Sequence, residues 1–305
     1  MNTSCNSTLQ AWLTLENPVA KAYTGSLLVL GLLLNGLALW VLCCRLPQWT
    51  ETRVYMTNLA AADLCLLCSL PFMLYSLKGQ EDTLLCQLSQ AIYLVNRYMS
   101  ISLVTAIAVD RYLAVRHALR ARGLRSPRQA AAVCAVLWAL VTSSLVLRWV
   151  LGMQDGGFCF SSSSKRPNNT MLFSLLGFYL PLALLVYCSL QVLLSLARRP
   201  AADPAQAEAT RKASRVVWAN LVVFVVCFLP LHLVLTVSFS MVPHSCAWRL
   251  RFRCLIYLTS RLSDANCCLD AICYYYMAKE FQEVCKAGLT AKAHKSQDSL
   301  CVTLT

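Results

Sequence analysis

The sequence predicts an all-α membrane protein, a seven-transmembrane helix bundle, and both its composition and its apolar blocks support this. The 305-residue chain is 58% hydrophobic and only 13% charged, and its mean hydropathy is +0.55. A soluble domain would carry roughly 25% charged residues, and a disordered chain needs low hydrophobicity. The apolar residues gather into blocks of about 20 residues, the length that crosses a bilayer core as a helix. A coiled coil is excluded because no charged heptad pattern is sustained.

Each apolar block is expected to be a helix, because backbone amides in lipid need internal hydrogen-bond partners. The alternating pattern of a transmembrane β-barrel is absent. In chain order the blocks span residues 22–44, 56–77, 88–112, 130–150, 171–196, 216–238 and 255–277. They define a seven-span domain over 22–277, with an N-terminal segment at 1–21, a short amphipathic interfacial helix at 278–290 and a tail at 291–305.

Polar and charged side chains interrupt the first, second, third and seventh spans. They are Asn35, Asp63, Arg97, Ser100, Asp110, Arg111, Asp264, Asn266 and Asp270. Charge inside a membrane is expensive and usually functional, although any one of these residues could simply bond to a neighbouring helix. Asp110-Arg111-Tyr112 ends the third span. There the acid can hold the guanidinium until protonation or helix movement releases it toward a partner's backbone carbonyls.

The fifth and sixth spans each contain a proline. Pro181 and Pro230 each remove one helix hydrogen bond, so both are expected to act as kinks or hinges. Phe228 places an aromatic side chain just before the second hinge. The loop between these spans, 197–215, is short and basic and cannot be a folded domain.

Lysine and arginine counts predict the orientation of the bundle. Of the 27 such residues, 16 lie on one side, 7 on the other and 4 within or at the ends of spans. The richer side is expected to be cytoplasmic, which places the N-terminus outside and the C-terminus inside. The net charge of +13 is expected to meet anionic membrane lipid, so it requires no nucleic-acid partner.

The N-terminal segment and outer loops carry features of an extracellular surface. Glycosylation sequons begin at Asn2, Asn6 and Asn168, all on the predicted outer side. Residues 1–20 lack the basic start and apolar core of a signal peptide, so the first span is expected to direct insertion. Among the outer cysteines, Cys5 is expected to pair with Cys246 or Cys254, or one or more of these thiols stays free.

Basic side chains on the outer half of the bundle predict an anion site. Arg97, Arg148 and Arg261 lie on spans three, four and seven, and Lys165 and Arg166 lie in the second outer loop. Asp264 is the one acid expected among them. It is expected to neutralise one arginine, Arg97 or Arg261, and to leave two helix-borne guanidiniums for a carboxylate or phosphate.

Tyr93 lies one helical turn outward of Arg97 on the same face, where its ring could stack on a ligand ring. The alternative is that Arg148 reaches the lipid headgroups while Arg97 pairs with Asp264. Arg249, Arg251 and Arg253 are interpreted as a solvated outer rim, which could also draw anions in.

The tail carries candidate modification sites. Cys285, in the predicted interfacial helix, is a candidate for palmitoylation, and a free thiol is the alternative. Ser296, Ser299, Thr303 and Thr305 are candidate phosphorylation sites that would present negative charge to a basic partner such as an arrestin. The alternative is a polar tail without such a role.

Six motifs in register with the spans resemble the rhodopsin-like (class A) G-protein-coupled receptors. They are Leu59-Ala60-Ala61-Ala62-Asp63, Asp110-Arg111-Tyr112, Trp138, Pro181, Cys227-Phe228-Leu229-Pro230 and Asp270-Ala271-Ile272-Cys273-Tyr274. The chain departs from the family pattern at Phe228, where the family usually has Trp, and at Ala271, where it usually has Pro. Residues 97–102 and 263–270 and the tail at 299–304 resemble one branch of this family. That branch responds to acidic aromatic molecules such as kynurenic acid, and lysophosphatidic acid has also been proposed for it.

The resemblance implies a plasma-membrane receptor with heterotrimeric G proteins of the inhibitory and thirteen types and arrestins as partners. It implies a disulfide between Cys86 and Cys159. It also implies a sodium ion among Asp63, Ser100, Asn266 and Asp270 with Asn35 nearby, unless one carboxylate is simply protonated. The implied G-protein coupling residues are Asp110, Arg111, Tyr112 and Tyr274, and the implied switch residues are Phe228, Pro230 and Pro181.

Other function classes fit the sequence less well. No cofactor is expected to be required. An organic-anion transporter, the main alternative, predicts an inverted internal repeat, which the sequence lacks. A retinal pigment needs a lysine in the seventh span for its Schiff base, and none is present. No nucleophile–base pair or histidine-based metal motif indicates an enzyme.

Overall fold

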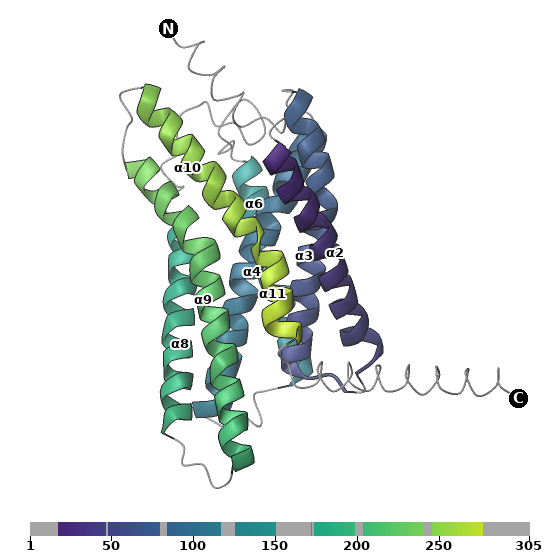
Figure 1. Ribbon diagram of the computed structural model, residues 1–305, viewed down its shortest axis with the longest axis vertical. Helices are drawn as coiled ribbons and strands as arrows, with labels where there is room; N and C mark the ends of the chain where they lie inside the picture. Colours follow the sequence, from purple (N-terminus) through teal and green to yellow (C-terminus); the bar gives the residue numbers. More distant parts are fainter. Residues whose placement is uncertain are drawn as a thin grey trace, which may run out of the picture.

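The computed structural model describes residues 18–46, 48–79, 84–116, 126–150, 172, 174–198, 204–240 and 246–276. These residues form helices that run side by side along one long axis, and no strand occurs among them (Figure 1). The all-α prediction is therefore confirmed for this part of the chain. The expected interfacial helix, the tail and most of the N-terminal segment lie outside the described residues.

The helices follow the predicted order of the spans. They are α2 (Pro18–Cys44), α3 (Glu51–Gly79), α4 (Leu84–Arg116), α6 (Pro127–Val150), the π-helix η1 (Leu175–Tyr179), α8 (Leu180–Ala197), α9 (Pro204–Ser240), α10 (Cys246–Asp264), α11 (Asn266–Asp270) and the π-helix η2 (Ala271–Tyr276). Among the described residues, six helices are long and apolar enough to cross a membrane. Their exposed surfaces are rich in large apolar side chains such as Leu33, Trp40 and Leu140.

The seventh span differs from the single continuous helix expected over 255–277. It consists of α10, α11 and η2, with a one-residue break in the regular α-helical pattern at Ala265, whose own N–H still bonds to the carbonyl of Arg261 at 3.3 Å. Two side chains from α2 bond to backbone carbonyls on either side of the break. The Tyr23 hydroxyl donates to the carbonyl of Arg261, and the Asn35 amide donates to the carbonyl of Cys267 at 3.0 Å. Tertiary hydrogen bonds therefore supply partners for backbone groups near this break.

The sixth span is longer than its apolar block. α9 begins at Pro204, so residues 204–215, expected to belong to the loop, are helical. Proline suits the first position of a helix, and the alanine-rich segment that follows has high helix propensity. Lys212 lies 2.8 Å from the Glu208 carboxylate one turn earlier, and its hydrogen bond lowers the pKa of that carboxyl.

Pro181 follows a π-helical turn at the start of the fifth span. In η1, the Leu180 backbone N–H reaches the carbonyl of Leu175, five residues earlier. Pro181 is the second residue of α8, where its missing N–H is tolerated. Pro230 lies inside α9, as the sequence predicts. Short π-helical turns of this kind are frequent at functional sites.

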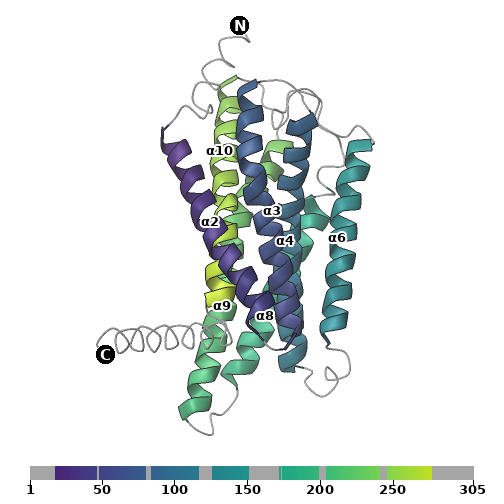
Figure 2. The same cartoon turned by 90° about the vertical axis from the view of Figure 1, so that its right-hand side faces the viewer.

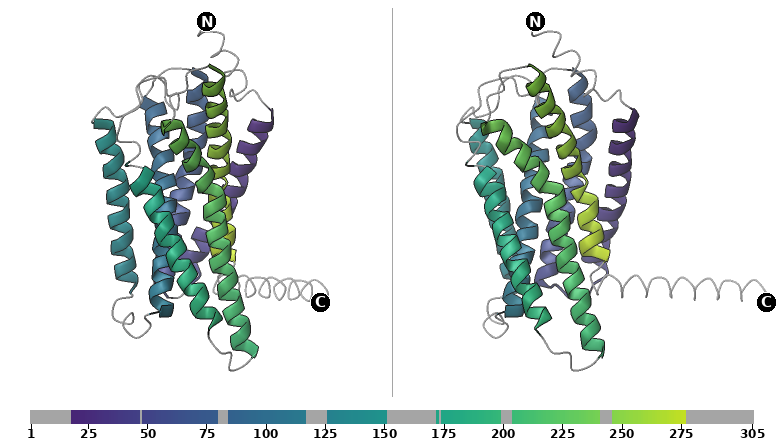
Figure 3. Two further views of the ribbon diagram at one scale, coloured as in Figure 1. Left: turned by 90° about the vertical axis from the view of Figure 1, so that its left-hand side faces the viewer. Right: turned by 60° about the vertical axis from the view of Figure 1, so that its left-hand side comes forward.

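α4 packs against α3, α6, α8 and α9, and it is the helix on which most of the candidate residues meet. α6 stands at the edge of the bundle, mainly against α3 and α4 (Figure 2). The Trp138 indole of α6 donates to Asn58 Oδ1 of α3 at 3.1 Å. On another side of the bundle α8 and α9 lie next to each other (Figure 3).

Candidate functional site

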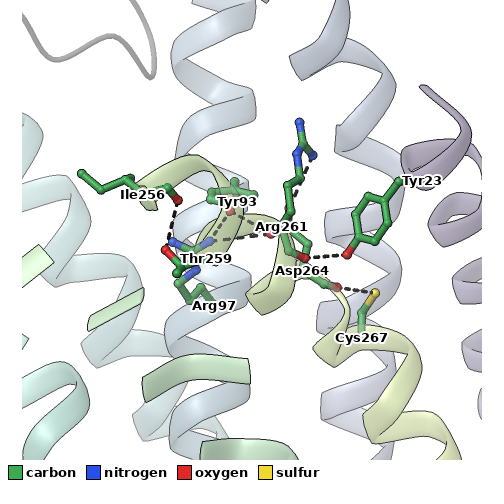
Figure 4. Close-up of polar contacts among 8 residues, drawn as sticks. All are labelled: Tyr23, Tyr93, Arg97, Ile256, Thr259, Arg261, Asp264 and Cys267. Carbon is green, nitrogen blue, oxygen red and sulfur yellow. Dashed lines mark hydrogen bonds and ion pairs between the residues drawn. The ribbon is translucent and has the colours of Figure 1, made fainter. Parts of the chain in front are cut away.

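An ion-pair cluster lies where α4 faces the end of α10. Asp264, the last residue of α10, places Oδ1 3.6 Å from Nη2 of Arg97 on α4. Its other oxygen, Oδ2, lies 3.5 Å from Nη1 of Arg261, one turn earlier on α10. Figure 4 shows these side chains gathered at the junction. Two guanidiniums therefore share one carboxylate.

Two tyrosines extend the cluster to a third helix. Tyr93 of α4 donates its hydroxyl to Asp264 Oδ1 at 2.8 Å and accepts a hydrogen bond from Arg97. The Arg97 guanidinium also lies 4.5 Å from the centre of the Tyr93 ring. Because Tyr23 of α2 donates to the carbonyl of Arg261, the cluster joins α2, α4 and α10.

The cluster is largely shielded from solvent and has excess positive charge. The side chains of Asp264, Arg97 and Arg261 are 3%, 10% and 15% exposed. Arg97 and Asp264 also line a small cavity of about 10 Å³, together with Phe228 and Asn266. A buried cation without a full counter-charge is costly, and a bound anion would offset that cost. The planar guanidinium suits a carboxylate or a phosphate.

The structure brings together four residues predicted for the anion site: Arg97, Arg261, Tyr93 and Asp264. Asp264 contacts both guanidiniums, whereas the sequence suggested that it would neutralise one. The Tyr93 ring, expected to face a ligand, faces the Arg97 guanidinium instead.

The other predicted anion-site residues are only partly visible. The backbone of Arg148 belongs to α6, but its side chain, together with Lys165 and Arg166, lies outside the described residues. In the outer rim, Arg251 is exposed and its guanidinium lies 5.2 Å from the centre of the Trp248 ring.

A second polar group is buried between α3, α4 and α11. Asp63 and Asp270 are 0% and 2% exposed. Asn96 donates to Asp63 Oδ1 at 3.2 Å, and Asn266 donates to Asp270 Oδ2 at 2.7 Å. Ser100 lies beside Asp63. The oxygens Asp63 Oδ2, Ser100 Oγ and Asn266 Oδ1 are buried without a satisfactory hydrogen-bond partner.

These oxygens fit the donor set of a hard cation such as sodium, which binds carboxylate, hydroxyl and amide oxygens. The described residues contain no group of three or more His, Cys, Asp or Glu side chains that could hold a metal. A cation here would therefore depend on serine and amide oxygens as well as on the carboxylates. Asn35 lies nearby on α2, where its amide nitrogen is used by the carbonyls of Gly31 and Cys267.

The residues expected to couple to a G protein lie near the other end of α4. Asp110 is buried, and Arg111 lines a small cavity of about 10 Å³ together with Ser189 of α8 and Asn220 of α9. The Tyr112 ring lies 5.9 Å from that of Tyr187 on α8. The backbone of Tyr274 belongs to η2, but its side chain is not among those described.

A stack of aromatic rings links α9 to η1. Phe228 is 1% exposed and packs edge-to-face on Phe224, with ring centres 5.2 Å apart. Phe224 stacks on Phe178 at 6.0 Å, and Phe178 stacks on His232 at 3.9 Å. The predicted switch residue Phe228 is thus connected through Phe224 to Phe178 of η1, the π-helical turn that precedes Pro181.

Several predicted sites cannot be located. The glycosylation sites, Cys159, Cys285 and the candidate phosphorylation sites lie outside the described residues, and so does the side chain of Cys86. Cys254, one suggested partner for Cys5, is a free thiol in the described part of the chain.

Sequence reasoning missed three polar contributors. Tyr23 lies near the start of the first helix and gives no local signal of its bond to α10. Asn96 precedes Ser100 by four residues, so helical spacing could have placed it beside the carboxylate pair. His232 is 1% exposed, and neither ring nitrogen has a hydrogen-bond partner. As a histidine in an apolar block, it could have been noticed.

Comparisons with known proteins agree with this architecture. Residues 34–274 match the family described as 7 transmembrane receptor (rhodopsin family). The chain is 68% identical to G-protein coupled receptor 35 of Homo sapiens over 99% of this chain and 98% of that protein. It is 66% identical to G-protein coupled receptor 35 of Mus musculus over 100% and 99%. It is 34% identical to Lysophosphatidic acid receptor 4 of Homo sapiens over 91% and 78%.

Proposed function

Because the chain belongs to the rhodopsin family of seven-transmembrane receptors, we propose that small acidic molecules are the ligands of this G-protein-coupled receptor. The ligand would bind against Arg97 and Arg261, where the small cavity beside Arg97 would widen to admit it, and would favour one of two packings of the helices. Such coupling between sites is limited by the difference in ligand affinity for the two packings.

One observation carries the proposal: Arg97 and Arg261 share the single carboxylate of Asp264. If all three side chains are ionised, the cluster holds one positive charge in excess. A carboxylate or phosphate that enters the cavity would supply the missing counter-charge, whereas a neutral molecule would not. Arg148, Lys165 and Arg166 are proposed to add further positive charge to the same site.

Two ligand classes are proposed. Aromatic acids such as kynurenic acid would place a carboxylate on Arg97 and pack a ring against the aromatic lining of the cavity. Lysophosphatidic acid would place its phosphate on the same guanidinium, and a relative at 34% identity is named as a receptor for that lipid. Both classes carry an anionic group, a carboxylate or a phosphate, and this group is the feature that the site would recognise.

The change at the other end of the bundle would use the two prolines. Kinks at Pro181 and Pro230 would let the inner ends of α8 and α9 separate, with Phe228 repacking between them. Arg111 would then leave Asp110 and contact the terminal helix of a G-protein α subunit. Inhibitory and thirteen-type G proteins are the proposed partners. Arrestins would recognise the phosphorylated tail.

We propose to test the function in cells with G-protein dissociation assays for inhibitory and thirteen-type G proteins. Kynurenic acid, its neutral methyl ester and lysophosphatidic acid serve as inputs. Arg97→Ala is expected to weaken both acids about 30-fold or more, because truncating one partner of a buried charge pair costs about 2 kcal/mol or more. The ester is expected to be weak on both chains.

Arg251→Ala is the matched control, since this arginine is exposed and bonds to no member of the cluster in the described contacts. Its concentration–response curves should match those of the native chain. Unchanged curves for Arg97→Ala at equal surface expression, or an ester as potent as the acid, would overturn the proposal.

A further inference from the structure

The contacts of Asp264 are geometrically weak for a buried ion pair. Charge-assisted bonds between a guanidinium and a carboxylate have lengths of about 2.7–2.9 Å. The two closest approaches here are 3.6 Å to Arg97 and 3.5 Å to Arg261. Among the described residues, the Tyr93 hydroxyl is the one group that bonds to this carboxylate at a normal distance, 2.8 Å. A ligand anion free to align with one guanidinium would therefore be a better partner than Asp264.

The position of Asp264 gives this weak contact a structural consequence. It is the last residue of α10, directly before the break at Ala265. Its partners Arg97 and Tyr93 both come from α4, so the carboxylate ties α4 to the broken segment of the seventh span. The helix that follows Ala265, α11, carries the buried side chains of Asn266 and Asp270.

We propose that Asp264 is an internal anion that occupies the place of the ligand and holds α4 and α10 in the resting packing. An acidic ligand activates the receptor by taking Arg97 from Asp264, which releases the junction at Ala265. This inference rests on the proposed function, because it assigns a regulatory role within the same site. Asp264 is thus both a competitor of the ligand and a link between helices.

Charge and linkage can be separated with three variants. Asp264→Asn removes the competing anion and the ionic link to both arginines, and retains at most the neutral hydrogen bond from the Tyr93 hydroxyl. Arg261→Gln leaves Arg97 and Asp264 as a neutral pair and keeps the link. The double variant Asp264→Asn/Arg261→Gln has the same net charge as the native cluster but no ionic link. A pure charge effect therefore predicts native behaviour for the double variant, and the linkage predicts otherwise.

The experiment measures G-protein dissociation without ligand and with kynurenic acid or its neutral methyl ester, at matched surface expression. Asp264→Asn should raise ligand-free signalling and increase the potency of the acid, but not of the ester, about ten-fold. Arg261→Gln should lower the potency of the acid about ten-fold and leave ligand-free signalling low. The double variant should retain raised ligand-free signalling with the potency of the acid at or above the native value.

Native ligand-free signalling in both Asp264→Asn and the double variant would overturn the inference. Asp264→Asn could fold poorly because it leaves both guanidiniums without a carboxylate. The double variant retains only the Arg97 guanidinium, so it tests the inference even in that case. Arg251→Gln on the same helix is the control for Arg261→Gln. If none of the acids causes G-protein dissociation with the native receptor, the proposed function is wrong instead. The ligand-free measurements on Asp264→Asn would still report on the link, so the two failures are distinguishable.

Discussion

At the scale of single residues, the buried oxygens around Asp63 carry a prediction about sodium. Asp63 Oδ2, Ser100 Oγ and Asn266 Oδ1 are buried without satisfactory partners, and Asp270 adds a second carboxylate. An ion bound only by the folded state stabilises it by RT ln(1 + [L]/Kd), about 1.4 kcal/mol at ten times Kd. The unfolding temperature of the purified receptor should therefore be higher in sodium chloride than in choline chloride.

Asp63→Asn is expected to abolish this difference, because it replaces a carboxylate ligand and leaves the size of the side chain almost unchanged. Equal ionic strength in the two salts removes general screening as an explanation. Asp264→Asn, which changes a carboxylate in the outer cluster, is the control and should keep the sodium effect. Equal unfolding temperatures of the native receptor in both salts would contradict a sodium site.

The residues of the ion-pair cluster were predictable individually, but the sharing of one carboxylate by two arginines was not. The apolar blocks contain the charged residues Arg97, Arg261 and Asp264. Because charge inside a membrane is energetically expensive, such residues are functional candidates wherever they occur. The three-residue spacing of Arg261 and Asp264 also predicts contact on one helix face. The approach of Arg97 depends on how α4 and α10 are packed, which no local pattern records.

At the scale of elements, hydropathy predicted where each helix lies but not where its regular geometry fails. Alanine is the best helix former, so nothing in the sequence marks Ala265 as a break. The bonds from Tyr23 and Asn35 to carbonyls near the break come from a helix more than 200 positions earlier in the chain. Conversely, α9 extends beyond its apolar block because residues 204–215 favour a helix in water as well.

The contact between α2 and α3 carries a prediction about stability. A Cβ atom built on Gly31 would lie 2.7 Å from both methyl carbons of Leu67, a side chain that is 0% exposed. Gly31→Ala therefore requires a buried leucine to move, and overpacking of this kind costs about 1–3 kcal/mol. We expect a lower unfolding temperature for this variant in detergent, measured by thermal unfolding of the purified receptor.

Gly36→Ala is the matched control, because a Cβ at this position on the same helix meets no other atom within 4 Å. It should be neutral or slightly stabilising, since alanine favours a helix more than glycine does. In a Leu67→Ala background, Gly31→Ala should lower the unfolding temperature by less than it does in the native receptor, because the obstructing methyl groups are gone. Equal unfolding temperatures for Gly31→Ala and Gly36→Ala would contradict this prediction, because α2 and α3 would then accommodate the extra methyl group without loss of stability.

At the scale of the whole molecule, two cavities lie along the same pair of helices. α4 and α9 line one cavity with Arg97 and Phe228, and they line a second cavity with Arg111 and Asn220. Phe228 of the first cavity packs edge-to-face on Phe224, one helical turn from Asn220 of the second. The two cavities therefore share both helices, and a coupling energy between them is measurable.

Coupling of this kind must be reciprocal. If an acidic ligand raises the affinity for a G protein by some factor, the G protein must raise the affinity for that ligand by the same factor, typically about 5–150-fold. Equilibrium binding of kynurenic acid to purified receptor in lipid discs, with and without nucleotide-free G protein, measures this factor. Arg111→Gln should bring it close to one without changing ligand affinity in the absence of G protein, because Arg111 lines the other cavity. A factor of one for the native receptor would mean that ligand binding at the arginine cluster does not control the cytoplasmic end.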